Sequence, residues 1–254
     1  MSLHLAILLL FLYFAMNLSG KIKLKCRQHV NPLDITYQIP IQLDAAWKEK
    51  FFVNPANPYI VDIGAAKGTW ALKYGMANPH HNIVGLEIRR PVVAYALQRR
   101  DNWNVKNVHF LSCNANVDLN SILASINTKS GSDNTSDASV DTSTNLISMI
   151  TIQFPDPCFK TKHKKRRVVN SDLINTIAKH ISKGTNVFLQ SDVLELEEDM
   201  VTQFHSHSEY FVPATNYDIS NLDKNVNPFD VQTEREISTL NKGLPVYRMM
   251  FTKI

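Results

Sequence analysis

Short apolar runs alternate along most of the chain with longer segments that mix apolar and polar residues. The apolar runs predict strands at residues 59–64, 82–88, 108–114, 146–154, 185–192 and 245–254. The segments between them repeat apolar residues at helical spacing and predict helices over residues 69–77, 91–100, 119–126, 171–181 and 193–205. This alternation is typical of an α/β fold with a doubly wound, mostly parallel sheet.

Two stretches depart from the alternation. Residues 129–145 are mainly Ser, Thr, Asp and Asn without an aromatic residue, which predicts a disordered insertion. Residues 5–16 form an uninterrupted apolar run, shorter than the roughly 20 residues that a membrane span needs, so we expect no membrane association. Three interpretations of this run stay open: a signal or anchor segment, an atypical targeting segment, or a misplaced translation start with the true start elsewhere. Initiation at Met16 would remove nearly all of the run.

Positive charge is concentrated in one short part of the chain. The net charge of the 254 residues is +4, and six of the basic residues lie between Lys160 and Arg167, so the remainder is slightly acidic. This predicts a local patch for a polyanion, with a solvated surface loop as the alternative. The three cysteines are far apart and lack metal-site spacing, which predicts a reducing compartment and neither a disulfide framework nor a metal site.

Polar residues stand at the carboxyl ends of the predicted strands, where parallel sheets bind ligands. After the first strand, the sequence DIGAAKG (62–68) lacks the G-x-G-x-x-G spacing of dinucleotide sites and fits the looser turn of S-adenosylmethionine methyltransferases. A bare strand–turn–helix is the alternative for this turn. Glu87 could accept hydrogen bonds from ribose hydroxyls, and the amide of Asn114 could pair with an adenine edge.

Further motifs surround a strand-end aspartate, Asp156, between two prolines. They are RQHVNPL (27–33), VDIGAAKG (61–68), GLEIRRPVV (85–93), FPDPCFKTKHKKRRVV (154–169), SD (191–192) and TEREISTLNKGLPVY (233–247). Through these motifs residues 27–254, apart from the insertion, resemble the tRNA (guanine-N7-)-methyltransferase family. Ala66, Trp70 and Cys158 depart from the family's pattern, and we expect Ala66 to be tolerated if its φ is negative.

The resemblance implies a Rossmann-like methyltransferase fold that binds S-adenosylmethionine and methylates N7 of a guanosine in the tRNA variable loop. It gives Asp156 the catalytic position. The implied cofactor contacts are Asp62, Gly64, Glu87, Ile88, Arg89, Asn114 and Ala115. The implied substrate contacts are Lys160, Asp192, Thr233 and Glu236. The expected contacts to RNA phosphates are Lys162, Lys164, Lys165, Arg166 and Arg167, with Arg27 and His29 as additions.

The resemblance also sets the expected organisation and setting of the protein. We expect an apolar N-terminal segment (1–20), a basic extension (21–58) and a methyltransferase domain (59–254). No obligatory protein subunit is indicated beside tRNA. The motif wording is similar to that of bacterial and plastid-type members, which favours a chloroplast-type organelle or the cytoplasm over the secretory pathway.

Three other functions stay open at this point. One is an S-adenosylmethionine methyltransferase that acts on guanosine in mRNA or rRNA. Another is an RNA-binding scaffold with a degenerate cofactor loop, suggested by Ala66, Thr69 and Trp70. The last is a dinucleotide-dependent oxidoreductase, which the missing glycine spacing disfavours.

Overall fold

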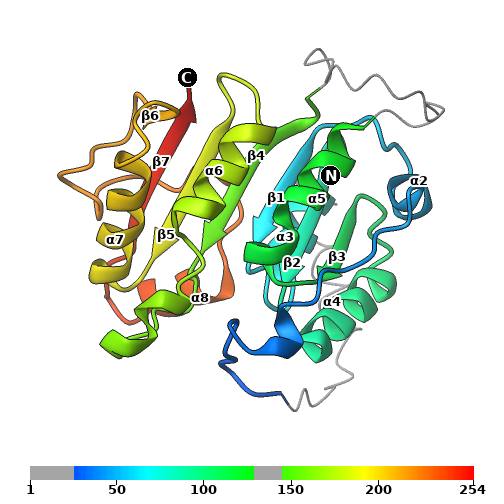
Figure 1. Ribbon diagram of the computed structural model, residues 1–254, viewed down its shortest axis with the longest axis horizontal. Coiled ribbons are helices and arrows are strands. Elements are labelled where there is room, and N and C mark those ends of the chain that lie inside the picture. The colour runs from blue at the N-terminus through cyan, green and yellow to red at the C-terminus, as the bar shows by residue number, and fades with distance from the viewer. Residues whose placement is uncertain (1–25, 129–144) are drawn as a thin grey trace, which may run out of the picture.

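The protein folds around one mixed sheet of seven strands (Figure 1) in the computed structural model, which describes residues 26–128 and 145–254. The strands are β1 (Tyr59–Ile63), β2 (Asn82–Glu87), β3 (Val108–Ser112), β4 (Ile147–Gln153), β5 (Asn186–Ser191), β6 (Phe211–Pro213) and β7 (Tyr247–Lys253). Their spatial order is β3-β2-β1-β4-β5-β7-β6, with β1 to β5 parallel and β7 antiparallel to both of its neighbours. The predicted doubly wound sheet is confirmed, and only the short strand β6 was missed.

Two predictions fall on residues that are not described. The apolar run 5–16 lies wholly outside the described part of the chain, as does nearly all of the insertion 129–145. Localisation therefore stays a prediction. Within residues 26–128 and 145–254, no helix is long and apolar enough to cross a membrane.

Helices cover both faces of the sheet. They are α2 (Trp47–Phe51), α3 (Thr69–Ala77), α4 (Arg90–Asn102), α5 (Ala115–Asn127), α6 (Ser171–His180), α7 (Leu194–His205) and α8 (Glu234–Leu240), with the 3-10 helices η1 (Ile35–Tyr37) and η3 (Thr161–Arg166). Helices α5, α6 and α7 pack side by side on one face, in front of the sheet in Figure 1. Helix α3 covers the other face. Phe251 stacks on Phe204 of α7, whereas Phe110 lies against Gly68 at the start of α3. The strand register places Phe110 and Phe251 on opposite faces of the sheet.

Two helices differ from the sequence prediction. Helix α5 begins at Ala115 rather than at residue 119, because the Asn114 side chain accepts a hydrogen bond from the Asn116 N–H and caps the helix. Helix α8 was not predicted as a helix. Its start is a capping box, in which Thr233 and Glu236 each bind the other's backbone N–H.

The central strands are buried on both faces, which explains why their sequences are continuous apolar runs. Every residue of β1 and β2 is buried. The strand order reverses between β1 and β4, so the chain diverges to opposite sides after Gly64 and after Phe154. Such a switch point leaves a crevice outside the carboxyl ends of the two strands.

One buried acid lies away from this crevice. Glu197 on α7 is 0% exposed, and neither of its carboxyl oxygens has a hydrogen-bond partner among the described residues. Burial raises its pKa well above the ordinary value, and the opposing effect of Arg248 is smaller. Between the unfolded pKa, about 4.3, and the raised folded pKa, the folded state binds more protons than the unfolded state. Glu197 therefore costs stability increasingly as the pH rises through that range.

We predict that Glu197→Gln stabilises the protein at pH 8 and that the gain shrinks toward pH 5. The difference in unfolding free energy should change by up to about 1.4 kcal/mol per pH unit, because the amide has no proton to lose. Urea unfolding at several pH values measures it. Glu198→Gln is the matched control, since Glu198 is the exposed neighbour on the same helix. Equal pH dependence in the two variants would contradict the prediction.

Candidate functional site

Two cavities open at the carboxyl edge of the sheet and share a wall. The first has a volume of about 330 Å³ and the second about 850 Å³. The residues that line both are Gln28, His29, Gly64, Ala66, Arg89, Phe154, Pro155 and Asp156. Asp156, the predicted catalytic residue, therefore lies at the boundary between the cavities.

The cavities divide the predicted contacts into two groups. Of the predicted cofactor contacts, the first cavity collects Gly64, Glu87, Ile88, Arg89, Asn114 and Ala115. The second collects Asp62 together with two of the predicted substrate contacts, Asp192 and Thr233. The structure thus brings together most of the residues that the sequence singled out.

The turn after β1 is built from left-handed backbone. Gly64 and Gly68 have φ values of +86° and +67°, and a Cβ on Gly68 would collide with the ring of Phe110. Ala66 has a φ of +47°, so the condition under which we expected alanine to be tolerated, a negative φ, is not met. A non-glycine residue in this region of backbone conformation costs about 1–2 kcal/mol, so Ala66 adds strain to the turn.

Asp62 is the buried acid of this turn. Its Oδ1 accepts hydrogen bonds from Thr151 Oγ1 at 2.8 Å and from Gln153 Nε2 at 3.3 Å. Burial raises the pKa of Asp62 to about 6, against the lowering effect of these two hydrogen bonds. The Asp62 carboxyl group is therefore half ionised near pH 6 and mostly ionised at pH 7.

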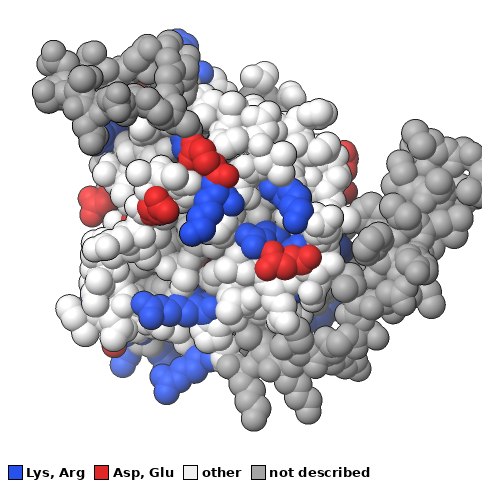
Figure 2. Space-filling view, turned by 90° about the vertical axis from the view of Figure 1, so that its right-hand side faces the viewer, with Lys and Arg blue, Asp and Glu red and all other residues white. Residues whose placement is uncertain are grey.

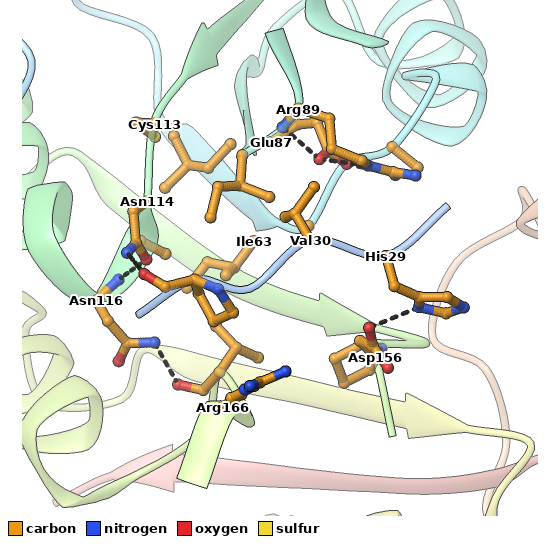
Figure 3. Close-up of a pocket in the computed structure, with 18 of the residues that line it drawn as sticks. His29, Val30, Ile63, Glu87, Arg89, Cys113, Asn114, Asn116, Asp156 and Arg166 are labelled. Atoms are coloured by element: carbon orange, nitrogen blue, oxygen red, sulfur yellow. Dashed lines mark hydrogen bonds and ion pairs between the residues drawn. The ribbon is translucent and has the colours of Figure 1, made fainter. Parts of the chain in front are cut away.

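Glu87 at the end of β2 is engaged by a single arginine. Arg89 Nε lies 2.9 Å from Oε1, Arg89 Nη2 lies 2.9 Å from Oε2, and the Arg89 backbone N–H also donates to Oε1 (Figure 3). A ligand hydroxyl at Glu87 would use the remaining lone pairs of these oxygens. Arg89 also donates from Nη1 to the carbonyl of Gln28 at 3.0 Å.

The side-chain amide of Asn114, at the end of β3, uses both of its hydrogens within the protein. Its Nδ2 donates to the carbonyls of Pro32 and Tyr37, each at 3.1 Å, while its Oδ1 caps α5. In this structure the amide has no N–H left to donate to an adenine edge, whereas Oδ1 keeps one lone pair that can accept from it. Asn114 contributes to the cavity as a wall and as an anchor for the N-terminal chain.

Residues 26–38, which we call the N-terminal strap, run along both cavities. Gln28, His29, Val30 and Pro32 line the first cavity, and Cys26 lines the second. His29 Nδ1 lies 2.6 Å from Asp156 Oδ2. The sequence analysis gave His29 to an RNA phosphate, but the structure places it on the predicted catalytic carboxylate.

The Asp156 loop has an unusual backbone on either side of the acid. Phe154 and Cys158 have φ values of +51° and +48°. The Cys158 N–H donates to Asp156 Oδ1 at 3.1 Å, so the cysteine contributes through its backbone. Burial raises the pKa of the Cys158 thiol, and the charge of Asp156 adds to the effect, so the thiol stays protonated.

The basic run divides into inward and outward side chains. Arg167 is 5% exposed and binds Glu195 at 2.7 Å, Asp199 at 2.8 Å and the carbonyl of Pro157 at 3.1 Å. This burial and these three hydrogen bonds, which tie the Asp156 loop to α7, argue against the predicted contact of Arg167 with phosphate.

The remaining cations of the run are more accessible. Lys160, Lys162, Lys164 and Lys165 are exposed, and Arg166 is half-buried against the first cavity. Lys164 pairs with Glu195 at 2.7 Å, an exposed contact that a phosphate could replace. Among the described residues, the face of the molecule at the right of Figure 1 lacks such a concentration of positive charge, because basic and acidic side chains are interspersed on it (Figure 2).

The C-terminal predicted contacts also divide by burial. Glu236 is 0% exposed, and its carboxylate accepts hydrogen bonds from Arg248 Nη2 and Asn227 Nδ2 at 2.9 Å. The prediction that Glu236 touches substrate is therefore wrong, and its role is to hold α8 and Thr233. Asp192 lines the second cavity and pairs with Arg235 at 2.5 Å.

Sequence analysis did not give a site role to Phe159 or Trp70, two aromatic residues that line the second cavity. Phe159 is 71% exposed and stands between Asp156 and the lysines. Trp70 is buried, and its Nε1–H donates to the carbonyl of Val231 at 3.1 Å, close to Thr233 in sequence. The signal for Phe159 was its position, an apolar ring inside a charged run.

The chain is similar to known proteins over most of its length. A family model described as "Putative methyltransferase" matches residues 56–131 and 136–249. The tRNA (guanine-N(7)-)-methyltransferase of Prochlorococcus marinus (strain NATL1A) is 39% identical over 227 residues, 89% of this chain and 96% of that protein. The protein of the same name from Thermosynechococcus vestitus is 40% identical over 229 residues, covering 90% of this chain and 95% of that protein.

A comparison of folds adds a more distant likeness. The solved structure of PH0851 aligns with a TM-score of 0.50 and 12% identity, and the alignment covers 82% of this chain and 45% of that one. At this identity the likeness concerns the fold alone.

Proposed function

The chain belongs to the tRNA (guanine-N(7)-)-methyltransferase family, and we propose that Asp156 is the residue that holds guanine for methyl transfer. The protein is a methyltransferase that uses S-adenosylmethionine and modifies N7 of guanosine in tRNA. Family membership argues against the two other classes of function, a dinucleotide-dependent oxidoreductase and a non-catalytic RNA-binding scaffold. The observation that carries the role of Asp156 is its place on the wall that both cavities share.

We assign S-adenosylmethionine to the first cavity and the adjoining turn after β1. The fit is supported by Gly64, where a Cβ would meet no atom within 4 Å, so the backbone is open to a ligand. Glu87 and Asp62 supply acceptors for the ribose hydroxyls and the ammonium group. When bound, the cofactor supplies an electrophilic methyl group on a positively charged sulfur.

Guanine needs positioning rather than activation. Its N7 carries a free lone pair near neutral pH, so no base is required, and its N1–H and N2–H₂ groups are donors. Asp156 is a matching acceptor: each of its oxygens has one protein partner and retains a lone pair. Methylation of N7 would leave positive charge on the guanine ring, beside which Asp156 would lie. A carboxylate fixed beside the ring stabilises that charge.

The second cavity and its rim suit the RNA around the target base. Lys160, Lys162 and Lys165 are exposed and form no ion pair with another described residue. Lysines in this setting bind phosphates without reading sequence. Phe159 offers an exposed ring on which a splayed base can stack. The family resemblance favours a base in the tRNA variable loop, and such a base can be splayed out to reach Phe159 and the cavity.

We predict that Asp156→Asn and Asp156→Ala lower the rate of methyl transfer to tRNA at least about 100-fold, because the acceptor for guanine and its charge are lost. Methyl incorporation into tRNA, with mapping of the modified base, measures the rate. Calorimetry should show cofactor affinity within about threefold of wild type, since Asp156 lies at the edge of the first cavity. Asp172→Asn, an exposed acid on α6, is the control. Retained activity, or loss of cofactor binding, would count against the assignment.

We predict that Lys162→Gln with Lys165→Gln weakens tRNA binding and reduces its dependence on salt. Losing two phosphate contacts should lower the slope of log affinity against log salt by roughly 1.4–1.8. Filter binding between 50 and 200 mM salt measures the slope. The control pair, Lys179→Gln with Lys183→Gln, removes the same charge from two exposed positions, one in the last turn of α6 and one just after it. Equal slopes for the two pairs would show that the run is only a solvated loop.

We predict that cofactor affinity depends on the ionisation of Asp62. Because the pKa of Asp62 is raised to about 6, its carboxylate is ionised above this pH and becomes neutral as the pH falls through it. Affinity for S-adenosylmethionine should therefore be constant at pH 7–8 and fall toward about tenfold per unit below pH 6. Calorimetry measures the profile. Asp62→Asn should bind weakly at every pH, and a wild-type profile in that variant would assign the titration to another group.

A further inference from the structure

The carboxylate of Asp156 is held from two directions. The Cys158 N–H binds Oδ1 at 3.1 Å from within the loop, and His29 Nδ1 binds Oδ2 at 2.6 Å from the N-terminal strap (Figure 3). Because an ionised carboxylate only accepts, the hydrogen lies on Nδ1. The length of the contact is typical of a charge-assisted hydrogen bond.

The contact with His29 restricts a rotation of the Asp156 carboxylate that the loop itself does not restrict. The Asp156 side chain is 40% exposed, and rotation about the last bond of an aspartate is only weakly restricted. With Oδ1 alone fixed, the plane of the carboxylate could turn away from the second cavity. A second donor on Oδ2 fixes the plane, and each oxygen still has a lone pair for guanine.

Neighbouring strands, rather than burial, hold His29 in place. Its side chain is 59% exposed, so packing around the imidazole is slight. The strap is fastened before it by Arg89, which binds the carbonyl of Gln28, and after it by Asn114, which binds the carbonyls of Pro32 and Tyr37. Residues at the ends of β2 and β3 thus hold the strap in the position where the His29 imidazole contacts Asp156, which follows β4.

We propose that His29 is a positioning residue for methyl transfer, which orients the Asp156 carboxylate toward guanine. The inference rests on the proposed role of Asp156. It gives the strap a part in the reaction that differs from binding RNA phosphate.

The atom that makes the contact allows a sharp test. An asparagine amide nitrogen lies as many bonds from Cα as Nδ1, whereas a glutamine amide nitrogen reaches the position of Nε2. His29→Ala should lower kcat about 10- to 100-fold, because misplaced groups lose rate on this scale. His29→Asn should recover most of the loss, and His29→Gln should stay near the alanine variant. The affinity for S-adenosylmethionine, the melting temperature and the salt slope of tRNA binding should all stay at wild-type values.

The outcomes separate this inference from its alternatives. Wild-type kcat in His29→Ala, or equal rates in the asparagine and glutamine variants, would overturn it. A reduced salt slope in His29→Ala would make the residue a phosphate contact, and a loss of cofactor affinity equal to the loss of rate would make it part of the cofactor wall. Asp156→Asn is assayed beside these variants: if it is active, the proposed role of Asp156 fails. If it is inactive while His29→Ala is fully active, only the role of His29 fails.

Discussion

The Asp156 carboxylate lies at the boundary of two cavities, and several parts of the surrounding structure hold it there. β4 ends at the switch point of the sheet, so the loop after it enters the crevice between the diverging halves. The prolines on either side fix their own φ angles. The left-handed φ values of Phe154 and Cys158 cost about 1–3 kcal/mol each, and the buried strand and the Arg167 contacts keep the loop in this conformation.

The acids at the strand ends solve a second problem, which is to keep negative charge available in a buried crevice. Burial alone favours the neutral form of a carboxyl group. Hydrogen bonds from Thr151 and Gln153 oppose this at Asp62, and Gln190 continues the row by donating to Gln153 at 2.8 Å. Glu87 is held by its bidentate contact with Arg89. A cationic ligand at this edge therefore meets an Asp62 carboxylate that two side chains already hydrogen-bond.

The sequence predicted elements and strand-end residues well, and predicted side-chain partners poorly. Periodicity determines where strands lie, and the parallel sheet then gathers their ends, so Asp62, Glu87 and Asp156 were found together. The partner of Arg167 lies 28 residues away on α7, and nothing in a run of cations distinguishes the buried member. For Glu236 a signal existed, because Thr233 and Glu236 have capping-box spacing, and that pattern indicates a helix start before it indicates a substrate contact.

The basic run contains one buried arginine, Arg167, and several exposed lysines, and this difference explains how the Asp156 loop can be ordered before RNA binds. If every cation between Lys160 and Arg167 faced solvent, the loop that carries Asp156 would depend on phosphates for its order. Arg167 instead binds two acids of α7 and the carbonyl of Pro157, all within the protein. The exposed lysines can then exchange water for phosphate without moving the carboxylate. A charge that is already fixed needs no reorganisation when the guanine ring becomes positive, and this is the condition under which electrostatic stabilisation is most effective.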